Sequence, residues 1–129
     1  MEYFRTINIK TTEDYIQKSL VLENLGEMST EIFNLGKPGD ATSNIGGIWG
    51  EFTLCLNKIR GGVRFALIEC PNALCWTITT GLQPEPEKIV LHLTINRQQI
   101  SAQFIEEIEE FIDDHSTCLE TFLTKENPQ

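Results

Sequence analysis

The sequence predicts one α+β domain: an antiparallel β-meander of four to five strands, backed by a long C-terminal helix and accompanied by an N-terminal helix. Two patterns carry this prediction. Residues 88–96 alternate apolar and polar side chains with the period of two typical of a strand. Residues 101–125 repeat apolar side chains every three or four positions, as an amphipathic helix does. The 129 residues match one ordinary domain without repeats or a linker, so residues 1–129 are assigned to a single domain.

The N-terminal region has the weakest pattern. Residues 3–9 are a strand candidate. Two threonines followed by two acids mark the start of a helix over residues 11–25, which Gly26 is expected to end. Residues 31–35 are a second short strand candidate. The chain from there to Gly47 has the composition of a turn followed by a flexible polar segment.

The middle of the chain predicts four strands in succession. Apolar residues alternate with polar or small ones from Phe52 to Leu56, and Gly61-Gly62 then supplies the positive φ that a tight hairpin needs. A Cys-Pro-Asn turn follows the second strand. Two prolines in residues 81–87 mark an exposed loop, because proline cannot donate to a ladder. Short connections of this kind are typical of an antiparallel meander. The predicted strands are residues 49–59, 63–69, 73–80 and 88–96.

The long helix predicted after Ser101 carries most of the negative charge. Residues 101–129 contain eight acids and one base, whereas residues 1–100 contain eleven acids and nine bases. The apolar stripe of this helix is expected to lie across the sheet. Its acidic face has two interpretations that the sequence leaves open: a solvated surface, which we favour, or a docking surface for a basic partner.

The overall charge and composition exclude several classes of function. With a net charge of −9, the chain is repelled by nucleic acids and by anionic lipids, so we expect neither as a partner. No apolar run approaches the roughly 18 residues of a membrane-spanning helix, and the start of the sequence does not resemble a signal peptide. The expected location is therefore the cytoplasm.

The cysteines and motifs predict neither a metal nor a cofactor. The four cysteines form no Cys-x-x-Cys pair, so free buried thiols are the simplest interpretation. Neither of the glycine-rich phosphate-binding patterns occurs. We therefore predict no bound cofactor and no metal site. The cysteines are Cys55, Cys70, Cys75 and Cys118.

The two histidines leave enzymatic activity open, although its absence is favoured. A general base at His92 would need a carboxylate or nucleophile nearby, and strand parity offers only Thr94 and Asn96. His115 falls on the apolar stripe of the long helix, where a histidine bonded to a backbone carbonyl is the simplest interpretation. A Cys–His pair that includes Cys70 stays an alternative. No catalytic residue is assigned.

The sheet face turned away from the long helix is the most informative surface. Its predicted side chains are small, β-branched or thiol-bearing, so this face is semi-apolar, and the N-terminal helix is expected to cover part of it. What remains is a candidate dimer face or ligand groove. Arginines near the Gly61-Gly62 turn could contact an anion, and a tryptophan after Gly46-Gly47 could line a pocket or an interface. The predicted binding residues are Trp49, Arg60, Arg64, Thr77, Val90 and His92.

One stretch resembles a known family. Thr42-Ser43-Asn44-Ile45-Gly46 is similar to the Ser-Asn-(Leu/Ile)-Gly stretch of condensation-like acyltransferases, and residues 93–96 and 104–122 look like the last strand and helix of that fold. The resemblance covers residues 40–123. The family acts through a His-His-x-x-x-Asp motif that this chain lacks, so the resemblance implies an accessory remnant and no catalytic residue is carried over.

The leading functional prediction is a non-catalytic cytosolic binding module that forms a homodimer or homo-oligomer. Its semi-apolar sheet face would bind a protein or a small apolar ligand. One alternative is a protein with a small-molecule pocket between the sheet and the helix, with chemistry at His92 or Cys70, or the acyltransferase remnant. Another is a small acidic chaperone of an extended client, which rests on overall design alone.

Overall fold

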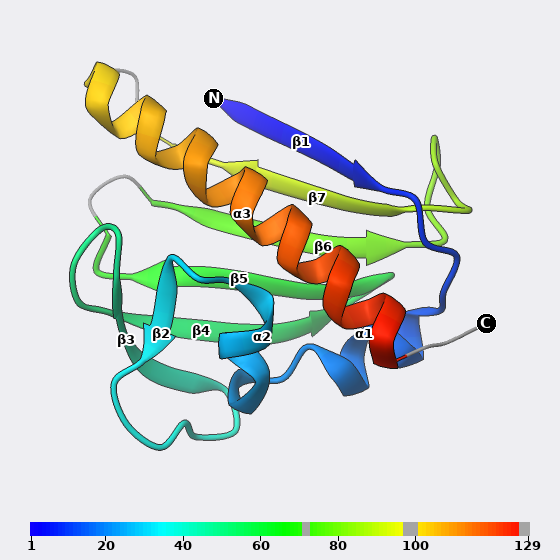
Figure 1. Ribbon diagram of the computed structural model, residues 1–129, viewed down its shortest axis with the longest axis horizontal. Coiled ribbons are helices and arrows are strands. Elements are labelled where there is room, and N and C mark those ends of the chain that lie inside the picture. Colours follow the sequence, from blue (N-terminus) through cyan, green and yellow to red (C-terminus); the bar gives the residue numbers. More distant parts are fainter. Residues whose placement is uncertain (71–72, 97–100, 127–129) are drawn as a thin grey trace.

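The chain folds into a curled antiparallel sheet with a long helix lying across it (Figure 1). The computed structural model describes residues 1–70, 73–96 and 101–126. Pro71 and Asn72, two of the three residues of the predicted Cys-Pro-Asn turn, therefore lie outside the described residues. In chain order, the elements are β1 (Glu2–Ile7), α1 (Glu13–Ser19), the 3-10 helix η1 (Leu22–Asn24), α2 (Leu25–Met28), β2 (Ile32–Asn34), β3 (Thr42–Gly47), β4 (Phe52–Ile59), β5 (Gly62–Ile68), β6 (Cys75–Thr80), β7 (Ile89–Thr94) and α3 (Ala102–Glu126).

The α+β class, the antiparallel sheet and the long C-terminal helix are confirmed, but the prediction of four to five strands is wrong. The sheet has seven strands in the order β1-β7-β6-β5-β4-β3-β2. The predicted meander forms its centre as β4 to β7, and β1 adds to the β7 edge. The other edge consists of β3 and the short β2.

The segment predicted to be flexible contains strand β3. Ser43 and Ile45 alternate toward the core and are 5% and 2% exposed, which is the burial pattern of a strand. Gly47 has φ of 146°, and a side chain there would overlap the backbone of Glu31. The glycines therefore allow β2 to approach β3 closely, which a composition-based prediction of a flexible loop misses.

The N-terminal helix is shorter than predicted. Thr12 caps α1 by accepting a hydrogen bond from the Tyr15 amide, as expected, but α1 ends at Ser19. Leu20 and Leu22 are both buried. Residues two apart lie on nearly opposite sides of a continuous helix, so both reach the core only because the helix breaks between them. Gly26 does not end a helix but lies within α2.

The core fills the space between α3 and the inner face of the sheet, which we define as the face toward α3. A cluster of aromatic rings lies within this mostly aliphatic core: Phe65 and Trp76 stack with centroids 5.4 Å apart, and Phe111 of α3 meets Trp76 edge-on at 5.1 Å. The buried residues of α1 belong to this same core. The expectation that the N-terminal helix covers part of the opposite, outer face is therefore wrong, because its apolar side chains are used on the inner side.

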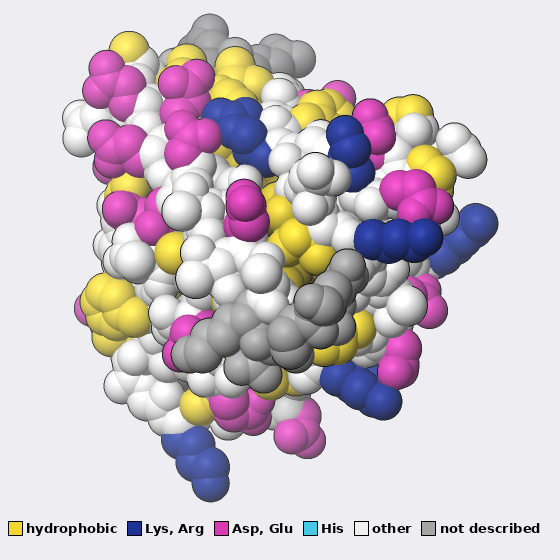
Figure 2. All heavy atoms as spheres, turned by 45° about the vertical axis from the view of Figure 1, so that its right-hand side comes forward, with side chains coloured by type: hydrophobic (Ala, Val, Ile, Leu, Met, Phe, Trp, Pro, Cys, Tyr) yellow, Lys and Arg dark blue, Asp and Glu magenta, His cyan; other side chains and the backbone are white. Residues whose placement is uncertain are grey.

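The surface is unevenly charged. Figure 2 shows acidic side chains gathered at upper left, over the N-terminal half of α3, apart from most of the lysine and arginine side chains. Whether this acidic face docks a partner stays a prediction. No helix within the described residues is long and apolar enough to cross a bilayer.

Candidate functional site

The outer face of the sheet gathers most of the exposed apolar surface. Strand register places one row of side chains across five strands on this face: Asn57, Arg64, Thr77, His92 and Phe4. Five large apolar residues among those described are markedly exposed, and four of them lie on this face. They are Phe4, Phe33, Leu35 and Ile68. An uncovered face with this content is a candidate binding surface.

One end of the outer face is hollowed into a cleft of about 320 Å³, which we call the outer-face cleft. Strands β6 and β7 form its floor, Phe4 of β1 bounds one side, and the loop after β6 bounds another. The side chains around it combine apolar surface with hydroxyl groups. The residues that line the cleft include Phe4, Arg60, Thr77, Thr79, Leu82, Pro84, Glu85, Val90 and His92.

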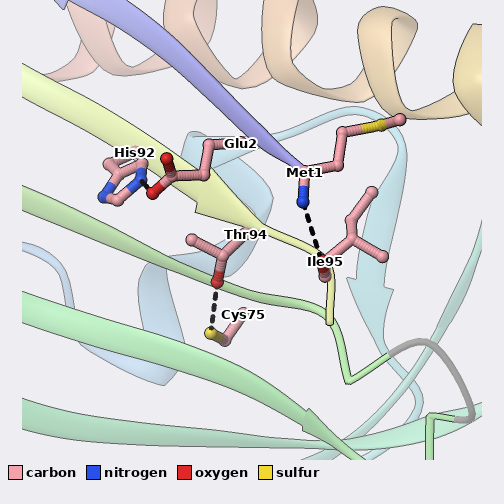
Figure 3. Close-up of polar contacts among 6 residues, drawn as sticks. All are labelled: Met1, Glu2, Cys75, His92, Thr94 and Ile95. Carbon is pink, nitrogen blue, oxygen red and sulfur yellow. Dashed lines mark hydrogen bonds and ion pairs between the residues drawn. The ribbon is translucent and has the colours of Figure 1, made fainter. Parts of the chain in front are cut away.

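His92 is held in the cleft by two contacts from β1. Its Nε2 lies 2.9 Å from Oε1 of Glu2, and its ring stacks on Phe4 with centroids 4.2 Å apart and planes 4° from parallel. A carboxylate only accepts hydrogen bonds, so Nε2 carries the proton and donates. Figure 3 shows the other ring nitrogen pointing away from Glu2. This orientation directs Nδ1 of His92, which can form a further hydrogen bond, away from the Glu2–His92 ion pair.

Sequence reasoning missed Glu2. Strand parity within residues 88–96 offered His92 only Thr94 and Asn96, whereas Thr94 instead contacts Cys75, with 3.0 Å between Oγ1 and Sγ (Figure 3). The carboxylate comes from 90 residues away, because β1 pairs with β7. The weak alternation over residues 3–9 was the available signal for that strand, but it did not reveal its partner.

The structure brings together four of the six predicted binding residues. Arg60, Thr77, Val90 and His92 all line the outer-face cleft. Arg64 lies beside the cleft, because it pairs with Thr77 in the register of β5 and β6.

Trp49 lies elsewhere. It packs against α3, with ring centroids 4.8 Å from Phe111 and 6.5 Å from Phe104. The prediction groups it with the sheet-face residues because it lies at the start of the predicted strand over residues 49–59. Its actual neighbours belong to the helix layer, so it is part of the packing between α3 and the sheet.

His115 is confirmed as a core histidine bonded to a backbone carbonyl. It is 1% exposed, its Nδ1 donates to the Met28 carbonyl at 2.5 Å, and Trp76 Nε1 donates to its Nε2 at 3.1 Å. These partners define a neutral ring with the proton on Nδ1. Burial lowers its pKa from 6.5 to about 4, against smaller raising effects of the Met28 hydrogen bond and of Asp114. His115 has no access to a ligand.

The cysteines and Asp114 are the other titratable groups that the sequence or the structure singles out. All four cysteines are free and half-buried, rather than fully buried as predicted. No cluster of three metal-ligating side chains occurs among the described residues. Asp114 binds the α2–β2 connection through Ser29 and Thr30, which is a structural role.

Comparisons with known proteins identify the fold. No protein-family model matches the sequence, and a search of curated proteins finds no significant match. Solved structures do match over nearly the whole chain. The protein XoxI from Bacillus cereus superposes with a TM-score of 0.64 at 14% identity, over 98% of both chains.

Two further structures agree. A START superfamily protein from Mycobacterium smegmatis gives a TM-score of 0.55 at 12% identity, over 93% of this chain and 94% of that one. An AHSA1-like protein from Aeromonas hydrophila gives 0.50 at 10% identity, over 94% and 93%. The resemblance to condensation-like acyltransferases is therefore wrong: it rested on a short stretch that forms β3, within a different fold. The chain has a START/AHSA1-like fold.

Proposed function

We propose that this protein is a non-catalytic binding module that holds a small, partly apolar ligand in the outer-face cleft. The observation that carries this proposal is the cleft itself, which is open on the face without helices and combines apolar walls with hydroxyl groups. Clefts of a few hundred Å³ with this mixture are typical small-molecule sites. The START/AHSA1-like fold is known for binding hydrophobic ligands or proteins, which supports a binding role.

The packing of the inner side favours the outer face as the site. Phe65, Trp76 and Phe111 are each at most 1% exposed and pack against one another between α3 and the sheet. A ligand bound there would have to displace these rings, and removing one large buried aromatic costs about 3–5 kcal/mol. The outer-face cleft requires no such displacement.

The absence of a catalytic assignment follows from what surrounds His92. A carboxylate–imidazole pair can orient a base, but among the described residues neither Thr77 nor Thr79, the threonines near it in the cleft, is hydrogen-bonded to His92. We therefore interpret His92 as a hydrogen-bonding residue of the binding site.

A matched pair of variants on the outer face tests the proposal. Val90→Asp places a charge on the cleft floor, whereas Ile68→Asp places the same charge on the same face outside the cleft. Native mass spectrometry of protein purified gently from its host is expected to show a ligand mass of a few hundred daltons on the natural chain. Val90→Asp is expected to lose that mass and Ile68→Asp to keep it. A natural chain that carries no added mass would count against the proposal.

A second candidate is a homodimer interface on the same face. Phe33, Leu35 and Ile68 are 51%, 48% and 44% exposed there, which is more apolar exposure than a solvent face needs. This candidate predicts a dimer mass that Ile68→Asp abolishes, while Val90→Asp retains it. The two candidates therefore give opposite results with the same two variants.

A further inference from the structure

Two arginines beside the outer-face cleft have no acidic partner. Among the described residues, no carboxylate lies within ion-pair distance of Arg60 or Arg64. The carboxylates around the cleft have other partners: Glu2 contacts His92 at 2.9 Å, Glu85 contacts Lys88 at 3.9 Å, and Glu13 accepts a hydrogen bond from the Gly61 amide at 2.6 Å. None of these three carboxylates forms an ion pair with either arginine.

Acidic side chains are abundant in this chain, 19 against 10 basic ones, yet neither arginine is paired with one among the described residues. Arg64 is moreover half-buried in the sheet face. Thr77, which pairs with Arg64 in the strand register, and Thr79 add hydroxyl donors on the cleft floor. The lining thus combines the Arg60 guanidinium and hydroxyl groups with apolar surface from Phe4, Leu82 and Pro84.

We propose that the ligand of the outer-face cleft is a small anion, in which an apolar ring or chain carries one carboxylate-like group that Arg60 binds. This inference rests on the proposed function and adds the charge of the ligand to it. A guanidinium presents its N–H donors as a planar fork, which matches a carboxylate better than a lysine does. Arg64 is expected to strengthen binding through its positive field, because it lies beside the cleft rather than in its lining.

The test uses two probes of the same shape that differ in charge: 2-naphthoate and the neutral 2-naphthamide. Their affinities are measured by isothermal titration calorimetry on the natural chain, Arg60→Gln and Lys58→Gln. Lys58 is the matched control, because it is an exposed cation on the same hairpin but does not line the cleft. Circular dichroism verifies that each variant is folded.

We expect the natural chain to bind 2-naphthoate about tenfold or more tighter than 2-naphthamide. Arg60→Gln should bring naphthoate to the level of the amide without weakening the amide, and Lys58→Gln should leave the ratio unchanged. High salt should weaken only naphthoate.

Other outcomes separate the two proposals. Equal binding of both probes to the natural chain would overturn the charge assignment and leave the cleft as an apolar binding site. A preference for naphthoate that survives Arg60→Gln would overturn the role of Arg60. Binding of neither probe would count against the proposed function itself.

Discussion

Replacing His115 with glutamine is expected to make folding less sensitive to acid. The unfolded chain binds a proton at this histidine below about pH 6.5, whereas the folded chain does so only below about pH 4. The unfolded state therefore holds more protons between these values, so the natural chain loses stability as the pH falls through this range. A glutamine can accept from Trp76 and donate to the Met28 carbonyl in the same place, but it does not titrate.

The magnitude follows from the two pKa values. Between pH 7.5 and pH 5.0, the linkage relation gives a loss of about 2 kcal/mol attributable to His115 in the natural chain and none in His115→Gln. Asp114 also has a lowered pKa. Burial raises that pKa, but hydrogen bonds from Thr30 and Ser29 lower it by more. The contribution of Asp114 to stability is lost at lower pH than that of His115, and it is present in both the natural chain and His115→Gln.

Urea denaturation at pH 7.5 and pH 5.0 measures the difference. The quantity compared is the change in unfolding free energy between the two pH values, so any cost of the substitution itself cancels. If the natural chain and His115→Gln lose the same stability on acidification, then His115 is not a neutral core residue with a hydrogen bond at each ring nitrogen.

Three further predictions concern single side chains. Gly62→Ala would place a Cβ on the Ile78 carbonyl oxygen, so it is expected to lower the free energy of unfolding by about 3 kcal/mol. Gly26 has open space around it, so Gly26→Ala is expected to raise the free energy of unfolding by about 0.5 kcal/mol. Thermal unfolding compares the two variants. Asp114→Ala removes the acceptors that bind the α2–β2 connection and should cost about 2 kcal/mol in urea, so an unchanged midpoint would contradict its role. Trp49 packs on α3, so Trp49→Ala is expected to lower the free energy of unfolding by about 3 kcal/mol without altering ligand affinity at the outer-face cleft. A changed affinity with unchanged stability would show instead that Trp49 belongs to the binding site.

The parts of the fold that the sequence predicts well are those where one periodicity dominates. Strand β7 alternates buried and half-buried side chains, and helix α3 repeats apolar side chains every three or four positions, because each element has one face toward the core and one away from it. Ser101 bonds the Phe104 amide at the start of α3, as its cap position predicts.

The elements that were missed lack such a pattern. Strand β3 has only two inward-facing side chains and ends in two glycines, so local composition resembles a loop. Residues 11–25 are predicted as one helix because the acid-rich start is followed by apolar residues as far as Leu25. The break after Ser19 arises from tertiary packing, which places both Leu20 and Leu22 in the core.

For the same reason, the sequence predicts part of the lining of the candidate site. Strand parity correctly places Thr77, Val90 and His92 on one face, and a hairpin brings Arg60 to it. Parity does not indicate which distant strand lies at the edge, so the Glu2–His92 pair and the Phe4 stack could not be foreseen. Trp49 shows the converse: proximity in sequence to a strand does not reveal which layer a side chain joins.

The central claim is that ligands bind on the outer face of the sheet and not between α3 and the sheet. A titration of ¹⁵N-labelled protein with 2-naphthoate, followed by amide chemical shifts, tests it most directly. We expect the largest shifts at Thr77, Thr79, Val90 and His92 and in the loop of residues 82–85, with little change at Phe111 or His115 on α3. Shifts concentrated on α3 and on Phe65 and Trp76 would contradict the account and place the ligand in the core layer.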